Sequence, residues 1–240
     1  MRAAPAPTAE QASELLLGET FMALERRDDW TWGYCAHDGY VGYVPSTALD
    51  DTDQPAPTHW VSAPQGLVFA AASIKAPLLV APPLGSRLAL TEFDDRFLAA
   101  TGGGFIHRRH VRPLGDWTQD PVAVAESLLG TPYLWGGRSR AGIDCSGLVQ
   151  TSLMACGAAC PRDSDMQQEL GTAVPEDAWD GGLRRGDLVF FPGHVGLMAD
   201  ATRLIHANAY WMTTVIEPLA DVVARLRPDH THPVVAVRRP

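Results

Sequence analysis

The sequence lacks long apolar runs. No stretch approaches the roughly 18 residues that a membrane-spanning helix needs. The opening residues, Met-Arg-Ala-Ala-Pro-Ala-Pro, also contain no apolar segment of the kind found in a secretory signal. We therefore expect no membrane partner and no export by a standard signal, and the predicted location is the cytoplasm.

An excess of positive charge is also missing. Lysine and arginine number 19 against 28 aspartates and glutamates, which gives a formal net charge of −9. Nucleic acids and anionic membranes select basic surfaces, so no nucleic-acid partner is predicted. Hydrophobic residues make up 46% of the 240 residues, which is enough to bury one substantial core or two to three small ones.

Cysteine is scarce. The four cysteines are too few for a disulfide framework in a chain of this length, and their spacing does not match paired CxxC zinc sites. They are Cys35, Cys145, Cys156 and Cys160. We therefore expect a reducing compartment.

Metal-ligand spacing is absent among the histidines outside the motifs described below. His107 and His110 lie in an arginine-rich turn, and His230 and His232 lie in a proline-flanked loop. Neither a metal ion nor a cofactor is predicted.

The first half of the chain contains two cycles of short apolar runs separated by turn signals. The first cycle covers residues 14–49, with Asp38-Gly39 marking a tight hairpin, and an acidic, proline-containing segment follows at 50–57. The second cycle ends at 104–111 with a glycine, an aromatic and a branched residue, as the first does at 42–49. These loose repeats predict two small all-β barrels, at 1–54 and 55–115.

The pattern changes at Asp116 to helices followed by strands. Helices are predicted at 121–129, 145–156 and 163–170, and strands at 186–191, 194–199, 203–207, 213–216 and 234–238. Helices that precede an antiparallel sheet indicate an α+β fold. Residues 116–240 are therefore predicted to form a third domain.

One cysteine lies where a nucleophile would be placed. Cys145 follows the glycine-rich, aromatic loop 130–137 and comes directly after Asp144, a favourable residue to cap a helix. The first turn of a helix favours a thiolate, because its backbone N–H groups and macrodipole stabilise negative charge. A buried helix residue is the plainer alternative, but the Asp-Cys-Ser sequence beneath a Gly-Gly loop favours a catalytic thiol.

Two histidines can complete a cysteine hydrolase site. His194 opens the apolar run Gly-His-Val-Gly-Leu-Met, and His206 lies within the next run, Leu-Ile-His-Ala-Asn. A hydrolytic cysteine needs a base and a group that orients this base, and His194 and His206 can take these two roles. The alternative for His194 is a structural histidine at a strand edge. The alternative for His206 is a core histidine whose hydrogen bonds are satisfied.

At these residues the chain resembles the NlpC-type cell-wall cysteine peptidases, whose papain-like domain carries an Asp-Cys-Ser-Gly helix start and a Gly-His-Val-Gly strand. The resemblance covers 116–240. With two SH3-like barrels before this domain, the chain looks more narrowly like the γ-D-glutamyl-L-diamino acid endopeptidases of murein peptide recycling. The resemblance implies cleavage of the γ-D-glutamyl bond to diaminopimelate or lysine in murein peptides with a free N-terminal L-alanine.

The resemblance also implies a substrate site in the third domain. In these relatives acidic and hydroxyl groups hold the alanine amine, and Asp144, Ser146 and Ser164 match them. Tyr133 and Trp135 could wall a small subsite. A plain helix cap is the alternative for Asp144, and packing at a helix start is the alternative for the two serines.

The first barrel contributes to the site in the narrower family. Tyr40 looks like the tyrosine placed near the thiol, and Glu19 is the candidate for the acidic residue near the amine. An ordinary hairpin aromatic is the alternative for Tyr40. The chain departs from the family pattern at Tyr43, where a tryptophan commonly follows the glycine.

Two other functions remain open at this point. The same thiol scaffold could serve an amidase or acyltransferase, which would differ only in the subsite. The chain could also be a non-catalytic cell-wall binding protein, although the intact Cys145, His194 and His206 set argues against this. The expected partner is a murein-derived peptide, and the sequence makes no prediction of oligomeric state.

Overall fold

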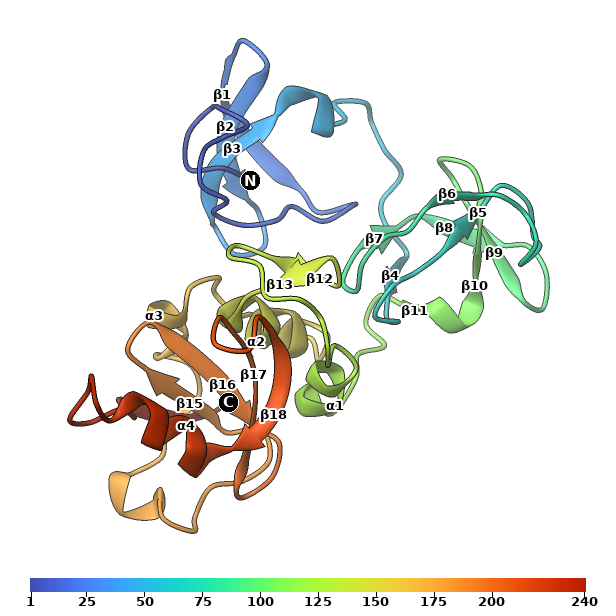
Figure 1. The fold of residues 1–240 in the computed structure, drawn as a ribbon. Helices are drawn as coiled ribbons and strands as arrows, with labels where there is room; N and C mark the ends of the chain where they lie inside the picture. The colour runs from blue at the N-terminus through green and yellow to red at the C-terminus, as the bar shows by residue number, and fades with distance from the viewer. The chain divides into compact units, whose positions relative to one another are not determined.

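The computed structural model describes residues 1–240 and divides them into two compact units, Met1–Trp117 and Thr118–Pro240 (Figure 1). The boundary lies close to the predicted start of the third domain at residue 116. None of the helices is both long enough and apolar enough to cross a membrane. Each unit is described separately below.

The first unit begins with a three-stranded antiparallel sheet in the order β1-β2-β3. Its strands are β1 (Phe21–Arg27), β2 (Trp30–Cys35) and β3 (Val41–Pro45), followed by the short helix η1 (Ser46–Ala48). The predicted Asp38-Gly39 turn connects β2 to β3. Gly39 has a φ of 73° there, and its N–H donates to the Cys35 carbonyl at 2.8 Å.

The second cycle of strands forms two further sheets in the same unit, in the orders β6-β5-β10-β9-β8 and β11-β4-β7. The elements are β4 (His59–Val61), β5 (Val68–Phe69), β6 (Leu78–Val80), β7 (Arg87–Leu88), β8 (Leu90–Glu92), β9 (Phe97–Ala100), β10 (Phe105–His107), η2 (Arg108–His110) and β11 (Val111–Pro113). Val61, Val68, Leu98 and Ile106 belong to one buried apolar cluster, so both sheets share a core.

The second unit is built on a six-stranded sheet in the order β14-β19-β15-β16-β17-β18. The strands are β14 (Thr172–Ala173), β15 (Leu188–Phe191), β16 (His194–Met198), β17 (Arg203–Asn208), β18 (Thr213–Pro218) and β19 (Ala236–Arg239). A separate ribbon pairs β12 (Arg138–Ser139) with β13 (Gly142–Ile143). All the named pairs are antiparallel, as the α+β prediction requires.

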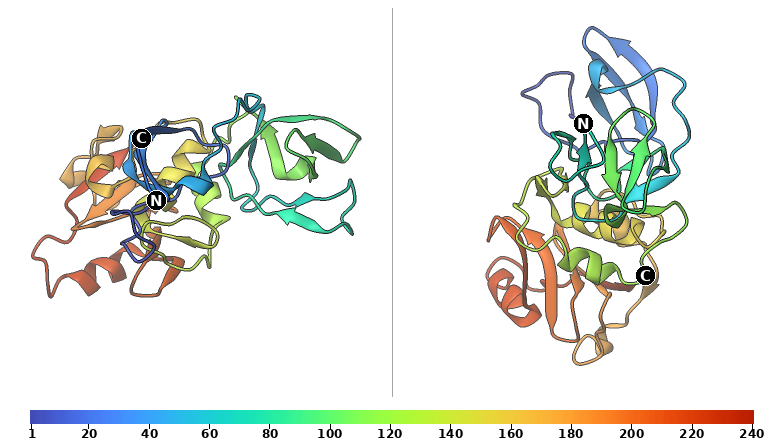
Figure 2. Two further views of the ribbon diagram at one scale, coloured as in Figure 1. Left: turned by 90° about the horizontal axis from the view of Figure 1, so that it is seen from above. Right: turned by 90° about the vertical axis from the view of Figure 1, so that its right-hand side faces the viewer.

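Helices cover this sheet. They are α1 (Pro121–Glu126), α2 (Cys145–Met154), α3 (Ser164–Gln167), η3 (Glu176–Ala178) and α4 (Leu219–Leu226). The helices α1 and α2 contact β17, whereas residues of α4 pack on a cluster that contains Phe191 and Leu204. The right view of Figure 2 shows α1 and α2 on one side of the sheet and α4 on the other.

Three of these helices are shorter than the sequence predicts, and α4 is not predicted at all. α2 ends at Met154, and Gly157 follows with a φ of 79°, a conformation that glycine adopts at helix ends. α1 ends at Glu126, before the turn at Gly130. The apolar residues of α4 face the sheet, a tertiary contact that the local pattern alone did not reveal.

Candidate active site

Cys145 is the first residue of α2, as predicted. The Asp144 side chain caps this helix and accepts a hydrogen bond from the Gly147 N–H at 2.7 Å. Cys145 is buried, with 6% of its surface exposed, and the backbone N–H groups of Val195 and Ser146 act to lower the pKa of its thiol. The helix α2 also packs against β16, the strand that begins with His194.

The two predicted histidines lie in direct contact. His194 opens β16, and its Nε2 is 2.8 Å from His206 Nδ1 on the neighbouring strand β17. His206 is almost fully buried, with 1% of its surface exposed. The structure therefore brings His194 and His206 together, and Cys145 is the first residue of α2, which packs against both of their strands. A relay from the thiol through the two histidines stays a prediction.

Burial keeps all three groups neutral. It raises the pKa of the Cys145 thiol to about 11, with the Asp144 charge acting in the same direction. Burial also lowers the pKa of His194 to about 3, assisted by the charge of His206, and it lowers the pKa of His206 despite the nearby carboxylate of Glu217. A thiolate favoured by the helix start was expected, but the protonated thiol is favoured, so attack requires a base.

A second group of polar residues surrounds His206 and was not predicted from the sequence. Glu217 Oε1 and Asn208 Nδ2 each lie 2.9 Å from His206 Nε2. Arg225 of α4 binds both oxygens of Glu217, at 3.1 and 2.5 Å, and the Trp211 indole N–H also donates to this carboxylate. The signal available in the sequence was weak: Asn208 follows His206 by two residues on one strand and so shares its face.

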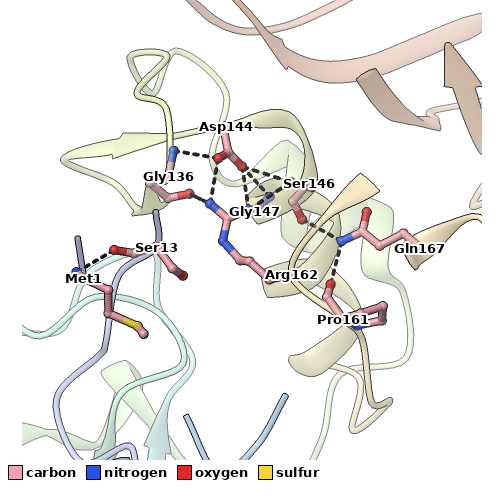
Figure 3. A network of polar contacts seen from close by, with 10 residues as sticks. Met1, Ser13, Gly136, Asp144, Ser146, Gly147, Pro161, Arg162 and Gln167 are labelled. Atoms are coloured by element: carbon pink, nitrogen blue, oxygen red, sulfur yellow. Dashed lines mark hydrogen bonds and ion pairs between the residues drawn. The ribbon is translucent and has the colours of Figure 1, made fainter. Parts of the chain in front are cut away.

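The carboxylate of Asp144 is the centre of a buried network (Figure 3). Arg162 donates to both of its oxygens, at 3.0 and 2.6 Å, and the Gly136 N–H donates to one of them at 2.8 Å. Ser146 Oγ accepts from Arg162 at 2.8 Å and lies 3.3 Å from Asp144. The sequence indicated Asp144 and Ser146 but not Arg162, whose partner Asp144 lies on another element, 18 residues earlier in the chain.

The network also fixes the segment before α3. Gln167 Nε2 donates to the carbonyls of Ser146 and Pro161, at 3.0 and 2.8 Å (Figure 3). Ser164 is the first residue of α3 and is half-buried. The structure thus places Ser164 three residues before a side chain that contacts the first turn of α2.

The glycine-rich loop is tied to β18 and the turn before it. The Gly130 N–H donates to the Thr214 carbonyl at 3.0 Å, and the Tyr133 N–H donates to the Met212 carbonyl at 3.0 Å. Burial, followed by the charges of Cys145 and Asp144, raises the pKa of Tyr133 to about 12. Tyr133 is therefore a neutral phenol beside the thiol, whereas Trp135 is largely exposed, with 57% of its surface accessible.

The two residues predicted from the first barrel lie in the first unit. Tyr40 follows the β2–β3 turn, where its N–H donates to Asp38 Oδ1 at 3.0 Å. Glu19 is buried and accepts from the Leu16 N–H at 2.8 Å. Their approach to Cys145 stays a prediction.

One group of donors in the first unit could hold a metal ion. The donor atoms of Cys35, His37 and Asp38 lie within 4.8 Å of one another. His37 Nε2 is 3.2 Å from Asp38 Oδ2, so an ion pair accounts for this arrangement when the imidazole is protonated. We assign no metal to it.

Comparisons with known proteins match two regions of the chain to known domains. Residues 130–221 match the NlpC/P60 family, and residues 1–49 match the bacterial dipeptidyl-peptidase SH3 domain. The C-terminal unit thus contains a region similar to the NlpC/P60 family, and a region similar to a bacterial SH3 domain precedes it.

Similar proteins share both parts of the chain. A gamma-D-glutamyl-L-lysine dipeptidyl-peptidase of Bacillus cereus is 26% identical over 86% of this chain and 70% of its own length. A protein of the same name from Bacillus subtilis is 26% identical over 88% of this chain and 77% of its own length. The crystal structure of an NlpC/P60 family protein from Bacillus cereus has a TM-score of 0.79, with 24% identity, and covers 95% of this chain and 81% of that one. This likeness confirms the fold.

Proposed function

We propose that the protein is a cysteine endopeptidase that hydrolyses the γ-D-glutamyl bond to a diamino acid in murein peptides with a free N-terminal L-alanine. The observation that carries this proposal is the direct contact of His194 with His206, on strands that pack against α2, whose first residue is Cys145. The names of the two Bacillus relatives support the choice of bond.

The reaction begins with a neutral Cys145 thiol and a neutral His194 imidazole. His194 takes the thiol proton as the Cys145 sulfur attacks the γ-carbonyl of the D-glutamyl residue, because neither group is charged beforehand. The N–H groups of the first turn of α2 supply donors for the oxyanion. His194 then gives its proton to the leaving amine, and water hydrolyses the thioester.

The free amine of L-alanine provides the specificity in this proposal. In this proposal Asp144, Ser146 and Ser164 hold the amine, and Tyr133 and Trp135 wall the subsite. Tyr40 and Glu19 are the proposed contributions of the first unit. A buried ammonium needs acceptor oxygens, and these side chains supply them. We also propose that the enzyme recycles such peptides in the cytoplasm, where cysteines such as these four, none of them in a disulfide, stay reduced.

Mass spectrometry of two matched peptides tests the proposal. L-Ala-γ-D-Glu-diaminopimelate and the same peptide with an acetylated alanine are incubated with the enzyme, and with Cys145→Ala as the control, at neutral pH with a thiol reductant. We expect cleavage of the free-amine peptide alone, and no cleavage by the variant. Equal cleavage of both peptides would contradict the amine subsite, and turnover by Cys145→Ala would contradict the thiol mechanism.

A further inference from the structure

Two groups compete for the same nitrogen of His206. Glu217 Oε1 and Asn208 Nδ2 both lie 2.9 Å from His206 Nε2. The carboxylate requires a proton on this nitrogen, whereas the amide N–H requires its lone pair. The amide cannot turn to relieve the conflict, because the Trp211 backbone N–H donates to Asn208 Oδ1 at 2.8 Å and so fixes its orientation.

Of the two groups, Glu217 makes the stronger hydrogen bond to His206 Nε2, and its carboxylate is fixed by other side chains. Arg225 binds both of its oxygens, and the Trp211 indole N–H donates to Oε1 at 3.2 Å. Arg225 itself lies over the Tyr210 ring, with its guanidinium carbon 4.1 Å from the centroid. Hydrogen bonds to a charged acceptor are about twice as strong as those between neutral groups. The hydrogen bond to the carboxylate is therefore the one that forms, and the proton of neutral His206 lies on Nε2, from which it is donated to Glu217.

The position of this proton determines which nitrogen of His194 can act. With a proton on Nε2, His206 has a lone pair on Nδ1, which must accept from His194 Nε2–H across the 2.8 Å contact. His194 then keeps the lone pair of Nδ1 for the thiol proton. If Asn208 Nδ2 instead donated to His206 Nε2, His206 would carry its proton on Nδ1 and donate it to His194 Nε2. The proton of His194 would then occupy Nδ1, and the base would be blocked.

We propose that Glu217, held by Arg225, is the positioning residue that sets the tautomers of both histidines, and that Asn208 imposes the opposite tautomers when Glu217 is removed. This inference rests on the proposed function only for its effect on turnover. The tautomers themselves are a property of the substrate-free protein.

A pair of variants tests the proposal. Glu217→Ala removes the acceptor and leaves Asn208 as the partner of His206 Nε2. Adding Asn208→Asp restores a carboxylate at the position now 2.9 Å from that nitrogen, and its other oxygen can still accept from Trp211. Asp229→Ala, at an exposed acidic residue after α4, is the control.

The readouts are the ring-nitrogen NMR shifts of 15N-labelled histidines and the turnover of L-Ala-γ-D-Glu-diaminopimelate. We expect Nε2–H tautomers for His194 and His206 in the wild type, in Asp229→Ala and in the double variant, and Nδ1–H tautomers in Glu217→Ala. Turnover by Glu217→Ala should fall by about 100-fold or more, the scale of general-base catalysis, and the double variant should recover most of it.

Either of two results would overturn the proposal: Nε2–H tautomers that persist in Glu217→Ala, or a double variant that fails to restore both tautomer and turnover. If Glu217→Ala does not fold, Glu217→Gln retains a carbonyl acceptor and is expected to keep the Nε2–H tautomers, so their loss would count against the proposal. A wild type that shows the expected tautomers but cleaves no peptide would refute the proposed function and leave the tautomer assignment intact.

Discussion

Cys145 illustrates at the scale of a single residue how burial opposes a helix terminus. A helix start stabilises a negative charge by about 0.3–1 kcal/mol, which is less than one pKa unit. Burial can shift a pKa by several units, and here it raises the pKa of Cys145 to about 11 together with the Asp144 charge. The sequence predicted that Cys145 begins a helix but not its protonation state, because its burial depends on other elements such as β16, against which α2 packs.

This protonation state predicts the pH dependence of alkylation. Because iodoacetamide reacts with the thiolate, the rate at Cys145 should rise about tenfold for each pH unit from neutrality towards pH 10. His194, whose pKa is lowered to about 3, does not titrate in this range, and Asp144 and Arg162 are the charged groups that bear on the thiol.

Peptide mapping by mass spectrometry would follow the labelling of Cys145 separately from that of the three other cysteines, with Cys145→Ser as the control. A rate that levels off between pH 7 and 8 would contradict the neutral pair and indicate a preformed thiolate and imidazolium.

At the scale of elements, the start of α2 depends on a buried ion pair. Arg162 lies before α3 and binds Asp144, with side chains that are 1% and 8% exposed. Removing one partner of a buried pair leaves an uncompensated charge, which costs about 3–5 kcal/mol. We therefore expect Arg162→Leu to lower the free energy of unfolding by about this amount in urea titrations.

Two further variants control this measurement. Arg140→Leu, at an exposed arginine, should change the stability by about 0.5 kcal/mol or less. The double variant that combines Arg162→Leu with Asp144→Asn removes the uncompensated charge but keeps a side chain that can cap the helix. It should therefore recover part of the lost stability. A stability of Arg162→Leu equal to that of the wild type would contradict the role given to this pair.

The elements also show which parts of the site could be predicted. Local patterns were enough to predict that Cys145 begins a helix and that His194 and His206 lie on apolar strands. Arg162, Glu217 and Arg225 were not found, because each acts through a partner on another element. Arg225 also belongs to α4, whose amphipathic pattern was not recognised, so the carboxylate it holds had no visible partner in the sequence.

At the scale of the whole molecule, the composition and the alternation of patterns predicted the change from short strands to an α+β fold, and the unit boundary lies between Trp117 and Thr118. The contribution of Tyr40 and Glu19 to the site is of a different kind. It came from a family resemblance and depends on how the first unit meets the second, which no local pattern encodes.

The proposed function requires that Cys145 form a thioester with the L-Ala-γ-D-Glu portion of the substrate. Rapid acid quenching during turnover of L-Ala-γ-D-Glu-diaminopimelate, followed by intact-mass and peptide analysis, tests it most directly. We expect an adduct of the Ala-Glu acyl group on the peptide that contains Cys145, and no adduct on the corresponding peptide of Cys145→Ala. An adduct that carries the diamino acid, or turnover by Cys145→Ala, would contradict it.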